Sequence, residues 1–489
     1  MRDHLFRVAK QSLVYGVGGA ALQLIGLVTF PILAREFEPS TYGVLEIGTA
    51  VFAVAVTVVD AGFASSAQRS YYDHPATEQV ERGRVLTTAL AATTAFSVVV
   101  ALVLVALREP ISQSLFDESR PGLITLIAAT IVVANAAAFV RQVFRLRLQP
   151  WHFTVSAVLS AGGAAVVIVV AVTAFDRGVD GVFLGLLVGN AIGLAYALVG
   201  TLDAFVPSLS RVELGRMLRY GLPLLPTALA MWSLMLVDRL MLGRLSSLGE
   251  VGQYAAANRV AAVLLLVVTA FATAYGPYAL SLYSEDRELE KRVRGRTLTY
   301  LTAVLMLVCV GLSLFAQELL AVLAPGYDRA YRGVLLVTLG GVALGIGSIV
   351  MAGISYTRRT TYFALLSVAA AAVNIALNLV LIPPFGMVGA AAATAVALGL
   401  LTAAYYVVSQ RLYPTPYEVR LVVAIVAVGI PAGAVGLLQF DRVEFELLVK
   451  LAAVASFLGA LYLLGVIRGT HLKELRIALT TIIRSREAT

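Results

Sequence analysis

A few charged side chains lie within long apolar stretches, and these are the residues of this sequence best suited to chemistry. They are Glu46, Asp60, Asp238, Arg239 and Arg259. A charge at bilayer depth is costly, so it faces a partner or a water-filled cavity and marks a path for an ion or a substrate. Because a guanidinium offers a planar fork of donors that suits phosphate or pyrophosphate, we interpret Arg259 and Arg239 as substrate contacts.

The acidic residues of this set are candidates for carrying a coupling proton or Na+. Glu46 and Asp60 are 14 positions apart, about 40° around a helix, so we expect them on one face, at different depths, toward a central cleft. Two alternatives stay open: Asp60 and Asp238 could neutralise nearby arginines, or Asp238 and Arg239 could reach water at the outer interface. Asn258 is a further candidate substrate contact, although asparagines in spans more often bond neighbouring helices.

Residues for catalysis or metal binding do not form a recognisable pattern. The four histidines are far apart in the sequence, and no metal-ligand spacing or GxxxxGK[ST] motif occurs. The single cysteine, Cys309, cannot form a disulfide within the chain. The sequence therefore predicts a protein that is not an enzyme and that has no metal or cofactor.

The composition is that of an integral membrane protein. The 489 residues are 59% hydrophobic and 13% charged, whereas soluble proteins carry roughly 25% charged residues. Fourteen stretches reach the ~20 apolar residues that a spanning helix needs. We expect spans at 12–34, 42–66, 84–107, 121–143, 153–174, 178–200, 220–243, 251–280, 297–316, 331–356, 361–382, 386–409, 419–438 and 447–467.

Basic residues are distributed unevenly between the two sides of these spans. If the N-terminus is cytoplasmic, 26 of the 37 lysines and arginines lie in the termini and even-numbered loops, and nine lie on the other side. This asymmetry predicts a multi-pass protein of the cytoplasmic membrane with both termini in the cytoplasm. The net charge of +8 follows this distribution, so we do not expect a nucleic-acid partner.

The first twelve spans form two halves that resemble each other. Tyr42-Gly43 and Val251-Gly252 each begin a span and are 209 positions apart, and Gly181 and Gly389 are 208 apart. Six spans per half is an even number, which gives parallel repeats with a substrate site near the midplane between them. We therefore expect an all-α fold of two six-helix lobes around a central cleft, with a C-terminal pair: 1–210, 211–412 and 413–489, the last including a short cytoplasmic tail.

Three segments are similar to motifs of one transporter family. They are NIALNLVLIPPFGMVGAAAAT (374–394), VDRLMLGRLSSLGEVGQYAAANRV (237–260) and VVDAGFASSAQR (58–69). In this order they resemble the Wzx-type polysaccharide-unit flippases of the MOP exporter superfamily. The resemblance covers essentially the whole chain, with modest specificity in each motif.

The resemblance implies a function in surface polysaccharide assembly. Such proteins move polyprenyl-pyrophosphate-linked oligosaccharides across the membrane by alternating access, which is coupled to ion flow. Of the candidate arginines, only Arg259 is carried over by the resemblance. Many relatives have twelve spans, so the two additional spans leave a lipid II flippase as an alternative, beside a MATE-type exporter of multiple drugs and organic cations.

Overall fold

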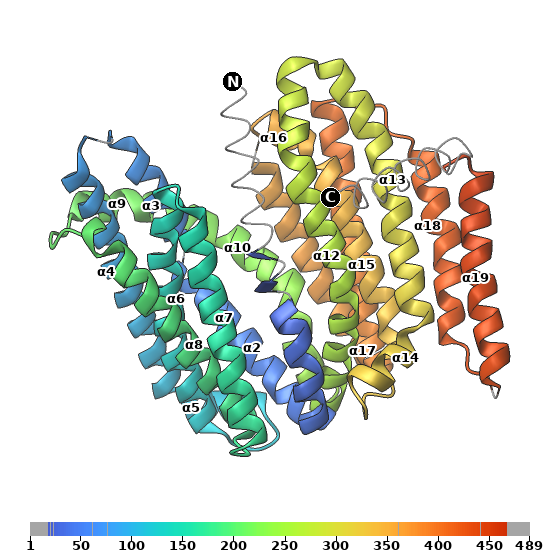
Figure 1. Ribbon diagram of the computed structural model, residues 1–489, viewed down its shortest axis with the longest axis horizontal. Coiled ribbons are helices and arrows are strands. Elements are labelled where there is room, and N and C mark those ends of the chain that lie inside the picture. Colours follow the sequence, from blue (N-terminus) through green and yellow to red (C-terminus); the bar gives the residue numbers. More distant parts are fainter. Residues whose placement is uncertain are drawn as a thin grey trace, which may run out of the picture. The chain divides into compact units, whose positions relative to one another are not determined.

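The computed structural model describes residues 18, 19, 21, 22, 24–60, 62–75, 77–359, 361–440 and 442–466 (Figure 1). Every regular element in this part of the chain is a helix, and twelve of the helices are long and apolar enough to cross a membrane. The predicted first span lies partly outside the described residues, and the predicted C-terminal tail lies outside them entirely. The all-helical fold class is therefore confirmed, while the count of fourteen spans is not.

Residues 24–36 are helical and precede the first labelled element. The longer helices follow in chain order: α2 (Pro39–Asp60), α3 (Phe63–Asp73), α4 (Gln79–Ala106), α5 (Arg108–Leu115), α6 (Pro121–Leu146), α7 (Pro150–Thr173), α8 (Gly178–Thr201), α9 (Arg211–Gly221), α10 (Leu225–Trp232), α11 (Asp238–Leu245), α12 (Leu248–Glu285), α13 (Arg287–Leu314), α14 (Ala316–Leu323), α15 (Tyr331–Val350), α16 (Ala352–Tyr356), α17 (Thr361–Leu412), α18 (Val419–Ala434) and α19 (Val443–Leu463).

The longest helix, α17, contains the predicted boundary between two spans. Its 52 residues would extend about 78 Å as one straight helix, far more than the ~30 Å hydrocarbon core. The backbone departs from helical geometry at Gly386 (φ 54°, ψ −130°), directly after Pro383 and Pro384. Because proline removes a backbone donor and glycine tolerates positive φ, the helix is interrupted at the predicted boundary between the two spans.

The second predicted span is broken, which the sequence interpretation did not foresee. The helix that we expected over 42–66 ends at Asp60, and α3 begins at Phe63 after a left-handed residue, Gly62 (φ 76°). A side chain at Gly62 would also collide with the backbone of Gly221. Glycine is therefore required here both for the left-handed backbone and for the close approach of the two segments.

The seventh predicted span, 220–243, is built from several short helical pieces. A 3-10 turn at Leu222–Leu224 separates α9 from α10, and a π-helical turn at Ser233–Val237 separates α10 from α11. Pro223 and Pro226 account for the first break, because neither can donate a backbone hydrogen bond. π-helical turns are rare and often mark functional sites, and this one directly precedes Asp238 and Arg239.

The chain forms two compact units. The first contains 1–259, 319–333 and 360–401, and the second contains 260–318, 334–359 and 402–489. These units group residues by contact, whereas the predicted ranges 1–210, 211–412 and 413–489 follow the internal duplication. The division into two six-helix lobes stays a prediction.

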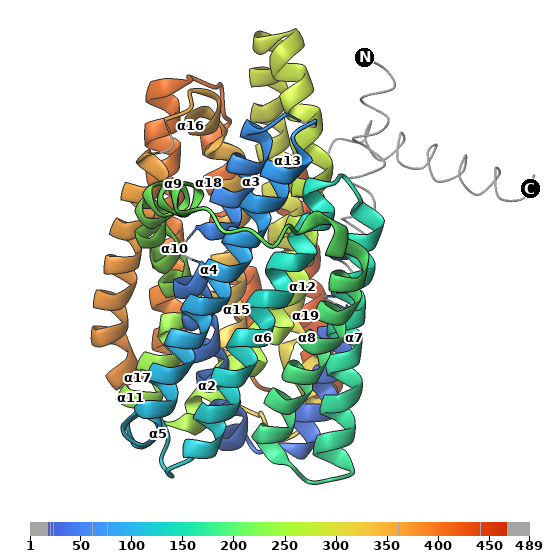
Figure 2. The ribbon, with the colours of Figure 1, turned by 90° about the vertical axis from the view of Figure 1, so that its left-hand side faces the viewer.

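Small residues allow helices of the first unit to pack closely. Helices α7 and α8 run side by side in Figures 1 and 2, and a side chain at Gly185, Gly189 or Gly193 of α8 would collide with α7. These glycines are four residues apart and so lie on one face of α8, where small residues let two helix backbones approach closely.

The core of the second unit is formed by α13, α15, α18 and α19. Met306 of α13 and Phe457 of α19 are fully buried, and both face Gly429 of α18. Lys450 of α19 is also buried, and its Nζ lies 2.5 Å from Glu318 Oε1 and 2.6 Å from Glu446 Oε1. Two carboxylates therefore compensate one buried cation.

Candidate functional site

Four of the predicted charged residues form one cluster in the first unit. Arg239 Nε lies 2.9 Å from Glu46 Oε2, and Arg239 Nη1 lies 3.2 Å from Asp238 Oδ1. Nη1 also donates to the carbonyl oxygen of Met235, within the π-helical turn, at 2.7 Å. The side chain of Arg239 is only 10% exposed. The π-helical turn thus supplies a carbonyl to a guanidinium that two carboxylates already hold.

Arg259 joins the same cluster at its edge. Its Nη2 lies 3.4 Å from Glu46 Oε1, and its side chain is 45% exposed, far more than that of Arg239. The neighbouring Asn258 donates from Nδ2 to the Tyr254 carbonyl oxygen, one helical turn earlier. Of the two arginines predicted to contact substrate, Arg259 therefore has the larger exposed fraction of its side chain.

Asp238 connects two of the segments that resemble family motifs. Its Oδ2 accepts from the Tyr254 hydroxyl at 2.5 Å and from Thr394 Oγ1 at 3.3 Å. Asn374 Nδ2 donates to the Thr394 hydroxyl oxygen, and Asn378 donates to Asn374 in turn. The motif from 374 to 394 thus meets the motif from 237 to 260 through hydrogen bonds that end at this carboxylate.

The charges of this cluster cancel. Two carboxylates, Glu46 and Asp238, face two guanidinium groups, Arg239 and Arg259. Asp238 is 1% exposed, so it does not reach toward water, and it neutralises Arg239 as one of the two alternatives expected. Among the cations of this cluster, Arg259 has the exposed side chain, whereas that of Arg239 is buried.

Asp60 lies apart from the cluster and lines a cavity of about 700 Å³ within the first unit. Ligand pockets in proteins measure roughly 300–1,000 Å³, so this cavity can hold a small molecule or part of a larger one. Glu46 and Asp60 therefore take part in two different environments on one helix. The lining comes from α2, α3, α4, α6, α7, α10 and the π-helical turn, and its polar members are Thr57, Asp60, Thr93, Asn135, Arg141, Gln142 and Trp232.

Several polar groups of this cavity have hydrogen-bonding capacity to spare. The indole Nε1 of Trp232 is buried and has no hydrogen-bond partner in the described part of the chain. Within the described residues, Gln142 makes no side-chain hydrogen bond, and Arg141 has no ion pair but lies over the Phe153 ring, 5.8 Å from its centroid. The cavity thus combines donors, acceptors and aromatic rings, which is a lining suited to a polar ligand with apolar faces.

The carboxylate of Asp60 also has a structural function. Its Oδ1 accepts a hydrogen bond from the backbone N–H of Ala64 at 3.3 Å, across the Gly62 turn. An acidic side chain at the start of a helix satisfies a free N–H and is favoured by the helix dipole. Asp60 therefore joins α2 to α3 while it faces the cavity.

A separate group of polar contacts joins the start of α12 and the segment before α2 to other parts of the same unit. Glu250 lies 2.8 Å from Arg329 and accepts from the Met387 N–H at 2.8 Å, next to the break in α17. Tyr327, between two spans, donates to the Phe37 carbonyl oxygen at 2.8 Å. Burial raises the pKa of Tyr327, which keeps this hydroxyl protonated as a donor. None of these residues stood out in the sequence, because each gains its partner only through folding.

The described part of the chain contains no group of three or more histidine, cysteine, aspartate or glutamate side chains that could hold a metal ion. The buried charges are instead paired with one another, as in the cluster around Arg239.

This architecture of apolar helices, buried ion pairs and a polar cavity defines a membrane transporter, and comparison with known proteins identifies its family. The family model described as "Polysaccharide biosynthesis protein" matches residues 8–283, and the chain belongs to this family, within the MOP exporter superfamily. Its relatives are transporters rather than enzymes. No curated protein sequence matches the chain significantly.

Solved structures of MOP transporters share the fold. The lipid II flippase MurJ in an inward closed conformation is 15% identical with a TM-score of 0.72, over 93% of this chain and 100% of that one. An inward-facing multidrug resistance MATE family transporter is 14% identical with a TM-score of 0.64, over 80% and 94%. A MATE transporter in complex with MaL6 is 12% identical with a TM-score of 0.59, over 83% and 95%. These likenesses establish a multi-pass membrane transporter fold.

Proposed function

We propose that this protein is a flippase for polyprenyl-(pyro)phosphate-linked oligosaccharides in surface polysaccharide assembly. It resides in the cytoplasmic membrane with both termini in the cytoplasm, and it works by alternating access coupled to a proton or Na+ gradient. The family supports the polysaccharide pathway. The observation that carries the proposal is the polar cavity of about 700 Å³ among apolar helices.

The cavity chemistry fits a sugar headgroup. Sugars present hydroxyls that need donors and acceptors, and C–H faces that pack on aromatic rings. Hydrogen-bonding groups for the hydroxyls come from Asn135, Gln142 and Arg141. Aromatic rings for the C–H faces come from Trp232 and Phe153. A lipid tail does not need such a lining, because it can stay in the bilayer.

The candidate residues take different parts in this proposal. Arg259 contacts the phosphate-bearing part of the substrate, with Asn258 beside it, because its side chain is 45% exposed and pairs with one carboxylate, Glu46, among the described residues. Arg239 remains a candidate contact, but its burial between Glu46 and Asp238 favours a role in holding Arg259 and Glu46 in place.

Ion coupling is assigned first to Asp60. It is the acidic residue of the candidate set that faces the cavity without an ion pair in the described residues, so a proton or Na+ can reach it. Glu46 and Asp238 couple less directly, since changes in their protonation would alter the pairing of Arg239 and Arg259.

A second candidate is a lipid II flippase. The likeness to MurJ extends over 93% of this chain, beyond the 80–83% covered by the MATE transporters named above. A MATE-type drug exporter is less favoured, because organic cations prefer acidic and aromatic cavities and this one also has Arg141.

Transport in reconstituted vesicles separates these functions. The protein in proteoliposomes is given a polyprenyl-pyrophosphate-linked oligosaccharide, lipid II or a fluorescent organic cation. An impermeant glycosidase reports which leaflet holds the sugar of each lipid, and fluorescence retained in the vesicles reports movement of the cation. We expect movement of the oligosaccharide lipid, increased by an ion gradient, and lost in Arg259→Ala but retained in the surface control Arg244→Ala. Movement of lipid II alone, or of the cation alone, would contradict the proposal.

A further inference from the structure

A second pocket in the first unit has a different character from the cavity at Asp60. It measures about 310 Å³ and is lined by Ser66, Arg69, Ser70, Asp73, Arg216, Arg219 and Tyr220. The residues from α3 are spaced at i, i+3, i+4 and i+7, and those from α9 at i, i+3 and i+4. Each set is therefore one face of a helix, and the two faces meet at the pocket.

The lining carries three guanidinium groups against one carboxylate, Asp73. Within the described residues, neither Arg69 nor Arg219 has a hydrogen bond or an ion pair. The Arg69 guanidinium instead lies over the Tyr220 ring, 5.2 Å from its centroid, a contact that leaves its N–H donors available. All three arginines are exposed, and Arg69 and Arg219 have no carboxylate partner among the described residues, so their positive charge is available at the pocket.

Hydroxyl donors complete the lining. Ser66 and Ser70 are 2% and 6% exposed, and neither hydroxyl bonds to another described residue. Guanidinium forks together with hydroxyls are the donors that recognise phosphate oxygens. Because Arg216 is paired with Glu213, Asp73 leaves one guanidinium charge of the lining without a counter-charge, and an anionic phosphate group would supply it.

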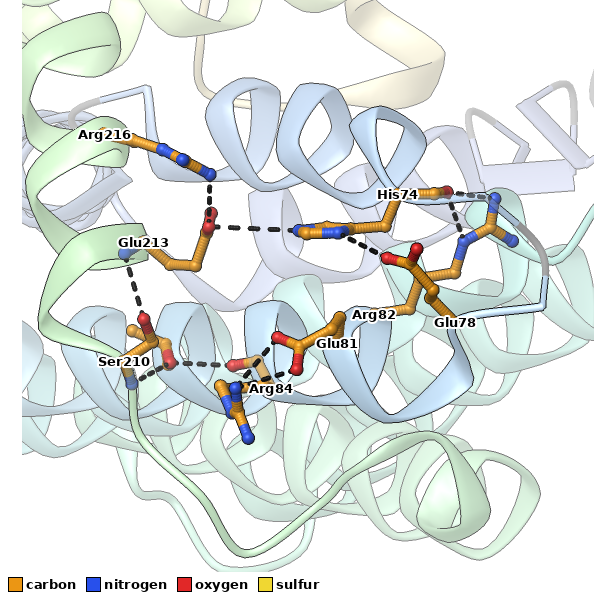
Figure 3. A network of polar contacts seen from close by, with 9 residues as sticks. His74, Glu78, Glu81, Arg82, Arg84, Ser210, Glu213 and Arg216 are labelled. Carbon is orange, nitrogen blue, oxygen red and sulfur yellow. Dashed lines mark hydrogen bonds and ion pairs between the residues drawn. The ribbon is translucent and has the colours of Figure 1, made fainter.

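The third guanidinium is held in place by a network at the same end of the unit. Arg216 Nη1 lies 2.6 Å from Glu213 Oε1, and His74 Nε2 lies 3.9 Å from the same oxygen, so Glu213 stands between them (Figure 3). The Glu213 backbone N–H donates to Ser210 Oγ at 3.2 Å, which fixes the start of α9. Of these contacts, the one between His74 and Glu213 joins the end of α3 to α9, whereas Arg216, Glu213 and Ser210 belong to α9 and its N-cap.

Helix α9 has the features of a helix at the membrane surface. Val212 and Leu218 are 64% and 37% exposed on a helix that also exposes Arg211, Arg216 and Arg219. A helix that presents apolar and basic residues to solvent lies well at the level of lipid headgroups. Because basic residues between spans concentrate on the cytoplasmic side, the arginines of α9 favour that side of the membrane for this helix.

We infer that the pocket between α3 and α9 binds a lipid-borne phosphate or pyrophosphate headgroup at the cytoplasmic surface of the membrane. The assignment of the ligand to the transport substrate rests on the proposed function, and it makes the pocket the place where the substrate is first captured. Arg69, Arg219 and the two serines contact the phosphate oxygens. Asp73 favours a ligand that also has a hydroxyl to donate.

Binding to the full-length protein in neutral phosphatidylcholine nanodiscs tests this inference. The probe is a fluorescent short-chain polyprenyl pyrophosphate, and the corresponding polyprenyl alcohol is the control without phosphate. We expect the pyrophosphate to bind and the alcohol not to. Arg69→Gln and Arg219→Gln should each weaken binding about tenfold or more, as expected for a charge-assisted hydrogen bond.

Arg211→Gln is the matched control, because it removes the same charge from the same helix outside the pocket. Equal melting temperatures of the variants would show that each is folded. Unchanged affinity in both pocket variants, or an equal loss in Arg211→Gln, would overturn the inference.

Competitors distinguish the possible sources of the phosphate. If inorganic pyrophosphate or phosphatidylglycerol displaces the probe as well as the unlabelled polyprenyl pyrophosphate does, the assignment to a lipid-linked substrate is wrong. Transport is measured separately in proteoliposomes. If no lipid-linked oligosaccharide moves but the binding pattern holds, the proposed function fails and the phosphate pocket stands. If Arg69→Gln/Arg219→Gln loses binding but transports at the normal rate with limiting substrate, capture at this pocket is refuted.

Discussion

Gly43 and Gly252 occupy equivalent places in the two halves of the sequence, and each lies against the helix of the other. A Cβ atom at Gly43 of α2 would overlap the carbonyl oxygen of Leu248, and one at Gly252 of α12 would overlap the carbonyl oxygen of Pro39. Both pairs of equivalent residues, Gly43 with Gly252 and Pro39 with Leu248, are 209 positions apart. Such reciprocal contacts are those of a local two-fold axis, so the offset found in the sequence has a counterpart in packing.

Substitution of either glycine should therefore separate α2 from α12. Gly43→Ala and Gly252→Ala each place a methyl group against backbone, which cannot rotate away as a side chain can. We expect a cost of about 1–3 kcal/mol or more, as for overpacked cores, seen as a lower melting temperature in detergent. The control is Gly249→Ala on α12, where an added Cβ meets only Ser247 Oγ, at 3.8 Å. A Gly249→Ala melting temperature as low as the others would contradict this explanation.

The two arginines of the charged cluster should respond differently to truncation. Arg239→Ala leaves Glu46 and Asp238 buried with one cation fewer, and removing one partner of a buried ion pair costs about 3–5 kcal/mol. Arg259→Ala removes a half-exposed side chain, so Glu46 keeps its shorter contact with Arg239. We expect Arg239→Ala to lower the amount of folded protein in the membrane, and Arg259→Ala to abolish complementation of a surface-polysaccharide defect at normal protein levels.

Arg259→Lys is the complementary variant, because it keeps the charge and removes the fork of donors. If Arg259 contacts a phosphate, the lysine variant should restore only part of the complementation. Full polysaccharide production by Arg259→Ala would refute the contact between Arg259 and the phosphate. Normal folding of Arg239→Ala would refute the stabilising role of Arg239 between Glu46 and Asp238.

The sequence was sufficient for much of the fold, and the physical reason is the membrane. Spans are recognised by apolar length, so most boundaries agree with the helices, and the predicted boundary between the spans 361–382 and 386–409 coincides with the break in α17. The breaks at Gly62 and at the π-helical turn were not predicted, since an apolar stretch has the same hydropathy whether it is straight or broken.

The candidate site was predicted only in part. Rarity of charge in spans was enough to select Glu46, Asp238, Arg239 and Arg259, which fold into one cluster. The pairing of Asp238 with Arg239 was one of the expected alternatives, but the pairing of Glu46 with Arg239 was not foreseen, because these two residues are far apart in sequence and meet only in the packed unit. The pocket at Arg69 was missed because its cations lie near helix ends, where basic residues are ordinary.

Lys450 offers a test of the second unit that does not involve the transport site. It is 1% exposed and paired with Glu318 and Glu446. Lys450→Ala should lower the melting temperature, because a buried cation and its packing are lost and Glu446 loses its partner. Lys291→Ala is the matched control: its partner Glu288 is 74% exposed, and such surface pairs contribute about 0–1 kcal/mol. Equal melting temperatures for the two variants would show that the Lys450 cluster does not stabilise the unit.

The two functions of Asp60 can be separated by two substitutions at one position. Asparagine keeps an oxygen that can accept from the Ala64 N–H, but it cannot exchange a proton or carry a charge. Alanine removes both the charge and the acceptor, and the loss of one such hydrogen bond costs about 0.5–1.5 kcal/mol. We therefore expect Asp60→Asn to fold like the unaltered protein and Asp60→Ala to melt at a lower temperature.

If Asp60 carries the coupling ion, Asp60→Asn should also transport at a rate that no longer depends on the imposed gradient. The rate should be measured in proteoliposomes with and without a pH or Na+ gradient, and Asp180→Asn provides a control acid in the first turn of α8, outside the cavity lining. Retained gradient dependence in Asp60→Asn would leave the residue as a link between α2 and α3 alone. A loss confined to Asp60→Ala would lead to the same conclusion, because it would follow the missing hydrogen bond and not the missing charge.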